Sequence, residues 1–343
     1  MIRTVNLAFI LLFVPAFILT NPISSLASEV IPFEISPVLP EKQNTGVFSY
    51  YDLNVNPNEI ITLSVEVKNN LDQPLIVNIT PFNATTSAIG DIAYDVNHKK
   101  EQFINLKVPL KQIGEAKNGI EIAPRSAARI PIEFKLPDED KGVVIGGIHV
   151  ISAEAPLSED IVQDEKTTFK INNQIAYIIG VKMQLPTKVA PVFAFDHAQA
   201  EISQGVPRLL LGMQNKAPAV IKDLSGTYVV TDKFGDQVLD GSFSNITMAP
   251  NTQFEYPVDW TDGQLEPGKY TVDLTADLDG KTITAKKTFT IKETEPVKEY
   301  NKDKAAAETK TDSSLPWWNY LLTAAGAGFI FFIIGRKSKK KQK

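Results

Sequence analysis

The sequence of 343 residues contains no cysteine, and this absence limits both its setting and its chemistry. Secreted animal domains of this size usually carry disulfides, so a cysteine-free exported chain favours a bacterial surface. The absence also excludes thiol catalysis and cysteine metal sites. Histidine is scarce as well: there are only His98, His149 and His197, and no two share the spacing of a metal site. We therefore interpret them as ordinary surface or core residues.

Positive charge is also sparse outside the C-terminal tail. The formal net charge is −5, although six basic residues lie within that tail. The body of the chain is therefore strongly acidic and lacks the basic footprint of a nucleic-acid-binding protein. We expect no nucleic-acid partner, and we find no motif that indicates a cofactor.

Motifs for catalysis are missing too. The chain has no Gly-x-Ser-x-Gly nucleophile motif. The acidic run at 138–140 lacks the alternating ligands of a calcium loop and is typical of a solvated turn. We predict a protein without enzymatic activity. Glycoside cleavage requires two carboxylates at a set distance in space, which a sequence does not show. A hydrolase of the bacterial cell wall therefore stays as a third hypothesis, after the two given below.

What the sequence does contain is a long apolar segment near its C-terminus. Residues 317–334 carry no charge, and a helix of that length rises roughly 27 Å, close to the thickness of a bilayer core. Basic residues beside a span stay in the cytoplasm. We predict a transmembrane helix at 317–335 and a cytoplasmic tail at 336–343, against the alternative of a buried core helix. The residues expected to anchor it are Trp317, Trp318, Tyr320, Arg336 and Lys337.

The N-terminus has the layout of a secretory signal peptide. Arg3 precedes an apolar run at 5–19, and small residues at Ser25 and Ala27 suit a cleavage site after Ala27. A signal peptide at 1–27 and one C-terminal span predict a single-pass type I protein of the cell membrane. Its ectodomain would lie on the extracellular, cell-wall side.

The body between these segments reads as short alternating strands. Ile61, Leu63, Val65 and Val67 point one way, and the polar residues between them point the other. The pattern recurs at 130–136, where Pro131 on the outer face suggests an edge strand. Residues 142–150 are apolar on both faces, which predicts a central strand whose glycines permit close backbone approach. Asp279-Gly280 predicts a hairpin between the last two strands.

These patterns predict an all-β fold with two consecutive immunoglobulin-like β-sandwich domains. The second domain is expected to begin with the strand at 175–183, and we identify no residue-level repeat between the domains. The predicted organisation is a first sandwich at 28–156, a connector at 157–167, a second sandwich at 168–293 and a disordered stalk at 294–316.

Several short motifs occur in an order that resembles the WxL-interacting proteins of Gram-positive bacteria. In the first domain they are FSYYDL at 48–53, PNE at 57–59, VKNN at 67–70 and GVVIGGI at 142–148. In the second they are IAYIIG at 175–180, NKAPAVI at 215–221, MAPN at 248–251, PVDW at 257–260 and PGKY at 267–270. The resemblance implies peptidoglycan binding by the first domain, host-factor binding by the second, and association with secreted proteins that carry Trp-x-Leu domains. It assigns no contact residues.

Exposed aromatic rings are natural anchors for a binding protein because they give a large contact area at low entropic cost. Phe48, Tyr50 and Tyr51 are the candidates for sugar stacking or partner contact, although alternate members of this run belong to a core, most of all Tyr51. A second possible mode is strand addition at an edge that Pro37 and Pro131 leave free.

The leading hypothesis is a non-catalytic, membrane-anchored surface protein that tethers peptidoglycan and a secreted WxL-domain protein. The alternative is an adhesin that acts mainly on a host extracellular-matrix protein.

Overall fold

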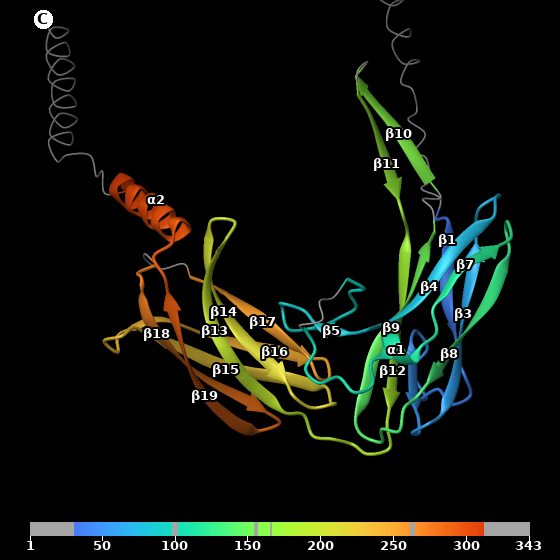
Figure 1. The fold of residues 1–343 in the computed structure, drawn as a ribbon, viewed down its shortest axis with the longest axis horizontal. Helices are drawn as coiled ribbons and strands as arrows, with labels where there is room; N and C mark the ends of the chain where they lie inside the picture. Colours follow the sequence, from blue (N-terminus) through green and yellow to red (C-terminus); the bar gives the residue numbers. More distant parts are fainter. Residues whose placement is uncertain (1–30, 98–101, 154–156, 165–166, 261–264, 312–343) are drawn as a thin grey trace, which may run out of the picture.

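The computed structural model describes residues 31–97, 102–153, 157–164, 167–260 and 265–311. Figure 1 shows two β-sandwiches that form the arms of a curved molecule. The two arms face each other across a hollow. The all-β prediction is confirmed for the described part of the chain.

The first sandwich consists of a three-stranded and a five-stranded sheet. The smaller sheet has the order β1 (Phe33–Val38), β3 (Ile60–Asn69), β8 (Ala127–Lys135). The larger has the order β2 (Tyr51–Asn54), β12 (Ala176–Gln184), β9 (Val143–Ser152), β4 (Leu75–Asn83), β7 (Lys117–Ile122). All pairs are antiparallel except β2 with β12. A single-turn helix, α1 (Leu110–Ile113), packs against β4, β9 and β8.

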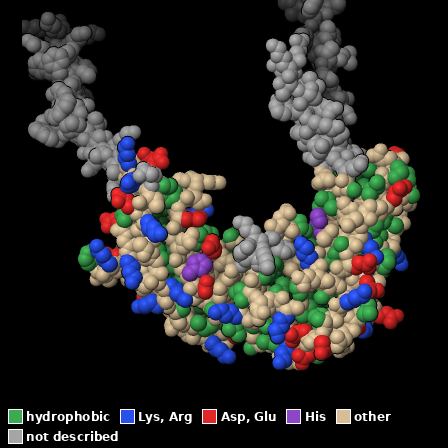
Figure 2. All heavy atoms as spheres, in the orientation of Figure 1, with side chains coloured by type: hydrophobic (Ala, Val, Ile, Leu, Met, Phe, Trp, Pro, Cys, Tyr) green, Lys and Arg blue, Asp and Glu red, His purple; other side chains and the backbone are tan. Residues whose placement is uncertain are grey.

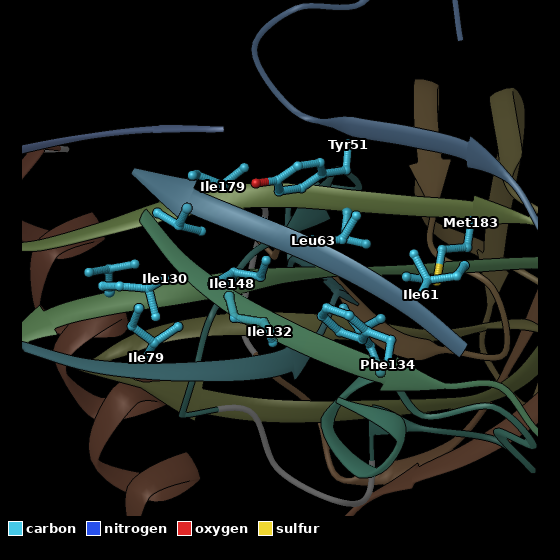
Figure 3. Close-up of a cluster of buried hydrophobic side chains, with 14 of the residues drawn as sticks. Tyr51, Ile61, Leu63, Ile79, Ile130, Ile132, Phe134, Ile148, Ile179 and Met183 are labelled. Atoms are coloured by element: carbon cyan, nitrogen blue, oxygen red, sulfur yellow. The ribbon is translucent and has the colours of Figure 1, made fainter. Parts of the chain in front are cut away.

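The core of this sandwich lies where the alternation predicted it. Ile61, Leu63, Val65 and Val67 are all buried on β3. The inward residues of the neighbouring strand β8, Ile130, Ile132 and Phe134, lie beside them on the same face of the sheet (Figure 3). β8 is an edge strand with Pro131 on its exposed face, as expected. β9 is central, also as expected.

The strand at 176–184 corrects the predicted domain division. It was expected to open the second sandwich, but β12 pairs along its whole length with β9 and also with β2. Its inward residues Ile179, Val181 and Met183 belong to the first hydrophobic core. Figure 3 shows Ile179 and Met183 there. The alternation of a strand shows that one face is buried but does not show against which sheet.

The residues predicted as a connector form part of a β-hairpin instead. β10 (Leu157–Asp164) pairs antiparallel with β11 (Thr167–Asn173), and the hairpin leads from β9 into β12. In Figure 1 it projects from the first sandwich on the same side as the C-terminal helix. The polypeptide that joins the two sandwiches is therefore the segment at 185–192.

The second sandwich has a three-stranded sheet facing a four-stranded one. The first has the order β13 (Phe193–Ser203), β14 (Val206–Asn215), β17 (Gln253–Asp259). The second has the order β16 (Gln237–Met248), β15 (Ile221–Thr231), β18 (Gly268–Leu278), β19 (Lys281–Ile291). The hairpin at Asp279-Gly280 is confirmed, and both residues have positive φ, as a tight turn of this kind requires.

The predicted stalk is largely helical. α2 (Glu295–Thr311) begins directly after the second sandwich and packs its first turns on it through Val297 and Tyr300. The side chain of Asn301 accepts from the backbone N–H of Leu265 and donates to its carbonyl, both at 2.9 Å. The apolar content of this segment is low, so the few contacts that dock the helix were not visible as a periodic pattern.

Other sequence predictions concern parts of the chain beyond these bounds. The signal peptide, the transmembrane helix at 317–335, the basic tail and the anchor residues Trp317, Trp318, Tyr320, Arg336 and Lys337 lie outside the described residues. Within the described part of the chain, no helix is both long enough and apolar enough to cross a bilayer.

The structure does reveal a residue-level repeat, which we call the asparagine corner. In the first sandwich, buried Asn69 ends β3 and accepts from the N–H of Leu71 at 2.9 Å. Its amide donates to the carbonyl of Gln73 at 2.8 Å and to those of Ile122 and Ala123 at 3.1 Å. One side chain thus fixes the turn after β3 to the segment before β8.

Asn215 does the same at the end of β14. It accepts from the N–H of Ala217 at 3.2 Å and donates to the carbonyls of Ala219 at 2.6 Å and Ala249 at 3.0 Å. In both corners the asparagine amide contacts a segment with the sequence Ala-Pro-x-Ser/Thr, at 123–126 and 249–252. In each segment the hydroxyl of the final Ser or Thr donates to the carbonyl of the alanine. The expectation of no repeat was therefore wrong. The signal was hidden because chain segments of different length separate the asparagine from its partner segment.

Candidate binding surfaces

The loop that carries the predicted aromatic anchors is held by Gln43. Its amide donates to the carbonyls of Val47 at 3.1 Å and Tyr50 at 2.9 Å. Phe48, in this loop, is 76% exposed, and Tyr50 is half-buried. These two side chains remain candidates for partner contact.

Tyr51 is not available to a partner. Its ring has no exposed surface and lies in the first core (Figure 3). Its hydroxyl donates to the carbonyl of Ser64 at 2.7 Å, and burial raises the pKa of the phenol well above its ordinary value. Successive residues of a strand face opposite sides, so Tyr50 and Tyr51 separate into a surface and a core residue.

Three aromatic residues gather on the outer face of the five-stranded sheet of the first sandwich. Tyr50 precedes β2, Phe82 comes from β4, and Tyr94 follows the short strand β6 (Ile92–Ala93). Phe82 and Tyr94 meet edge to face with ring centroids 6.4 Å apart. We call these rings, together with Gly147 and Gly180 beneath them, the aromatic face.

Two glycines make room for these rings. Phe82, Gly147 and Gly180 are register partners across β4, β9 and β12, so they form one row on the outer surface. A Cβ on Gly147 would come within 2.8 Å of the Phe82 ring, and a Cβ on Gly180 would lie 3.6 Å from the Tyr94 hydroxyl. Because these positions lack side chains, the rings lie close against the sheet.

The next row of the same surface adds a polar and an aliphatic neighbour. Thr80, His149 and Ile178 are register partners on β4, β9 and β12. Ile178 is 41% exposed and Tyr94 is 40% exposed, whereas Phe82 is only 2% exposed. Burial lowers the pKa of His149 below its ordinary value. The accessible surface is therefore apolar and bordered by hydrogen-bonding groups.

One ion pair borders the aromatic face. The carboxylate of Asp52 on β2, which is nearly buried, accepts from Lys182 Nζ on β12 at 2.9 Å and from the Asn44 amide at 2.9 Å. A buried carboxylate needs such partners to stay charged. The pair ties β2 and its preceding loop to β12 and leaves no net charge at this position.

The segment between Phe82 and Tyr94 also joins the two sandwiches. It contains β5 (Thr85–Thr86) and β6, and Figure 1 shows β5 between the arms. The hydroxyls of Thr86 and Thr252 are 2.6 Å apart and both residues are buried. The N–H of Thr247 donates to the carbonyl of Gly90 at 2.7 Å. The tip of this segment is therefore bound to the second sandwich, while Tyr94 at its end returns to the first.

A cleft of about 580 Å³ lies beside this connection, and we call it the interdomain cleft. Asp95 and Asn97 line it from the first sandwich, and the outer face of the β13–β14–β17 sheet lines it from the second. There the ring of His197 lies between two carboxylates: Nδ1 is 3.1 Å from Asp196 Oδ2, and Nε2 is 3.3 Å from Glu255 Oε1. Figure 2 shows the molecule from the side on which the hollow between the arms is visible.

The charge of the interdomain cleft is predominantly negative. Its lining includes Asp95, Asp196, Glu201 and Glu255, and Arg208 is engaged by Asp259 at 3.1 Å. Coulomb attraction therefore favours a polar or cationic group here over an anion. A smaller cavity of about 230 Å³ lies elsewhere along the contact between the sandwiches.

The remaining sequence candidates for chemistry are not brought together. His98 lies outside the described residues, and His149 and His197 lie on different sandwiches. Among the residues that the structure describes, no group of three such side chains is arranged so that it could hold a metal ion; His197, Asp196 and Glu255 are joined by hydrogen bonds instead. In the acidic run, Asp138 accepts from the Asn58 amide and Asp140 from the Thr187 hydroxyl, both at 3.0 Å, so these carboxylates hold loops in place.

Family models match both halves of this architecture. Residues 33–152 match the peptidoglycan binding domain of WxL Interacting Protein, and residues 166–302 match its host binding domain. The chain belongs to the WxL-interacting proteins. These matches confirm the resemblance and support a cell-surface binding protein with peptidoglycan and host partners. The match to the host binding domain includes β12, although this strand completes the first sandwich.

Solved structures that resemble this WxL-interacting protein are distant. The chaperone–tip adhesion subunit pre-assembly complex of Csu pili from Acinetobacter baumannii is 12% identical at a TM-score of 0.31, covering 74% of this chain and 97% of that one. A family 123 glycoside hydrolase from Clostridium perfringens is 14% identical at a TM-score of 0.25, covering 45% and 27%. At these TM-scores the similarity indicates neither the function nor the partners of this chain. Comparison with curated proteins gives no match.

Proposed function

We propose that this WxL-interacting protein is a non-catalytic, membrane-anchored surface protein that tethers peptidoglycan and a secreted WxL-domain protein. The observation that carries the proposal is the pair of family matches, a peptidoglycan binding domain followed by a host binding domain. Both families are binding domains, which supports a role without catalysis.

The membrane anchor rests on the sequence. The uncharged segment at 317–334 is followed by a basic cluster, which favours a span with a cytoplasmic C-terminus. Trypsin added to intact Gram-positive cells that express the full chain should then digest both sandwiches and leave a membrane-bound C-terminal fragment. Complete protection of the sandwiches, or recovery of the chain in the cytosol, would refute this topology.

Wall and partner binding need separate tests. Full-length protein in detergent should sediment with purified peptidoglycan sacculi, and it should co-purify with a WxL-domain protein from the same organism. The matched control is the same protein after heat denaturation. If the protein did not sediment with sacculi, wall tethering would be refuted. If it did not co-purify with the WxL-domain protein, that partner would be refuted. Peptidoglycan zymography would show a cleared band if the chain were a wall hydrolase.

A second candidate function is adhesion to a host matrix protein, favoured by the match at 166–302. The sandwich division matters for its test. Deletion of 168–293, the predicted second domain, would remove β12 from the first sandwich and expose its core. The deletion should therefore begin after Leu185, because this residue is still part of the first core. A chain that lacks 193–311 should lose matrix binding and keep wall binding, and equal loss of both would refute the division of labour.

A further inference from the structure

The aromatic face offers a ligand a surface that differs from the loop at Phe48. Phe48 is one exposed ring in a loop, whereas Tyr50, Phe82 and Tyr94 lie together on a sheet over two glycines. Rings supported by a β-sheet are preorganised, so little conformational freedom is lost when a ligand binds. The buried ring of Phe82 fixes the position of the exposed ring of Tyr94.

The chemistry of this surface suits an uncharged ligand with flat apolar faces. Tyr94 and Ile178 supply the exposed apolar area, and Thr80 and His149 supply hydrogen-bonding groups next to it. The charged groups at its border, Asp52 and Lys182, neutralise each other. A pyranose ring has one face of C–H groups and a rim of hydroxyls, and it stacks on aromatic side chains in this way.

We propose that the aromatic face binds the glycan strand of peptidoglycan, with one sugar ring stacked on Tyr94 and Ile178 and its hydroxyls directed toward Thr80 and His149. This inference rests on the proposed wall-binding function of the first domain. The aromatic residues all lie within the region matched to a peptidoglycan binding domain. The interdomain cleft begins at Asp95, directly after Tyr94, so a longer ligand on the aromatic face would continue toward it.

The test measures binding of full-length protein in detergent to purified sacculi, with soluble N-acetylglucosamine oligomers as competitors. Tyr94→Ala should weaken binding about tenfold, which is the loss of roughly one good aromatic contact. Tyr94→Phe keeps the stacking surface and should bind like the parent protein. Phe234→Ala is the matched control, because Phe234 is 78% exposed on the other sandwich.

A second variant tests whether binding depends on the position of the rings as well as on their presence. The Cβ that Gly180→Val introduces has only ordinary contacts, but its methyl groups would lie against Tyr50 and Tyr94 and displace the rings without removing them. It should also weaken binding. Unchanged thermal unfolding of each variant would show that the fold persists.

The outcomes are distinguishable. If the parent protein does not bind sacculi, the proposed wall-binding function fails. If the parent binds and both Tyr94→Ala and Gly180→Val bind equally well, the aromatic face is not the site, although the function stands. If both variants lose sacculus binding but the oligomers do not compete, the glycan is the wrong occupant. Loss of binding to a WxL-domain protein alone would instead assign this face to a protein partner.

Discussion

Thr86 and Thr252 are 166 residues apart in sequence, yet their hydroxyl oxygens are 2.6 Å apart at the contact between the two sandwiches. The hydroxyl of Thr252 also donates to the carbonyl of Ala249 at 2.8 Å. In the hydrogen bond between the two threonines, the hydroxyl of Thr86 is therefore the donor and that of Thr252 the acceptor. The Thr86 oxygen also accepts from the N–H of Ala249 at 3.1 Å. Thr252 belongs to the asparagine corner of the second sandwich. The corner thus stabilises its own turn and also receives a segment of the other arm.

The first prediction is that Thr86→Val weakens the coupling between the sandwiches. Valine keeps the shape of threonine but leaves the N–H of Ala249 without its partner, which should cost about 1–3 kcal/mol. Calorimetry should show two separated unfolding transitions where the parent protein shows greater overlap.

A double-mutant cycle provides the control. Thr86→Val combined with Thr252→Val should cost less than the sum of the two single changes, because the threonines share a hydrogen bond. Thr288→Val, at an exposed position on β19, should have little effect. Additive single effects would show that the two hydroxyls do not act together.

The second prediction concerns the asparagine corners. Asn69→Ala should lower the free energy of unfolding of the first sandwich by about 3 kcal/mol, because several buried backbone groups lose their partner at once. Asn215→Ala should have a similar effect on the second sandwich. The neighbouring Asn70, which is less buried, is the control, and Asn70→Ala should cost much less. Urea unfolding measures all three, and equal effects of Asn69→Ala and Asn70→Ala would contradict the role of the corner.

Local periodicity predicted much of the fold, because the residues that carry it act within one strand. The inward faces of β3 and β8 follow directly from alternation, and Asp279-Gly280 specifies its turn through backbone conformation alone. The assignment of β12 failed because pairing with β9 is a relation between distant segments. The helical, docked segment α2 was not predicted for a related reason. Its docking depends on a hydrogen bond between Asn301 and Leu265, which no local sequence pattern encodes.

The aromatic face was harder to predict than the strands. Phe48 and Tyr50 were predicted as contact candidates because they lie in one aromatic run, and they stay a prediction. The sequence did not indicate Tyr94, because its segment has no periodicity, or Phe82, because its pattern is that of an apolar residue of a strand. The glycines that support them, Gly147 and Gly180, were present in the family motifs, but their common row appears only when β9 and β12 are paired.

The third prediction is that Ser152→Ala stabilises the first sandwich. The hydroxyl of Ser152 is buried on the inner side of β9, and within the described residues it makes no hydrogen bond. Removing an unsatisfied buried polar group should raise the free energy of unfolding by about 1 kcal/mol. Ser126→Ala is the contrasting variant, because the Ser126 hydroxyl donates to Ala123 at 2.7 Å and its loss should destabilise. A decrease in stability for Ser152→Ala would indicate a partner that this explanation omits.

The fourth prediction uses His149 as a reporter of the row that borders the aromatic face. Burial lowers its pKa below the ordinary value of 6.5, so between the two values the unfolded chain binds more protons than the folded one. Stability should therefore fall as pH decreases from about 7.5 through 6.5, and the fall should continue to the lowered pKa of the folded state. In His149→Gln this part of the pH dependence should disappear.

The comparison between parent and variant isolates the histidine. The pKa values of Glu59 and Asp72 are also lowered, but from ordinary values of 4.5 and 3.8, so these carboxylates contribute at more acidic pH. Urea unfolding of both proteins at pH 7.5 and 5.5 should give a larger loss for the parent. Because Thr80 and Ile178, the register partners of His149, carry no charge, nothing in its row compensates for the proton. Equal losses would mean that His149 is as well solvated in the folded protein as in the unfolded chain. In that case, the surface beside Tyr94 would be more open to water than its burial indicates.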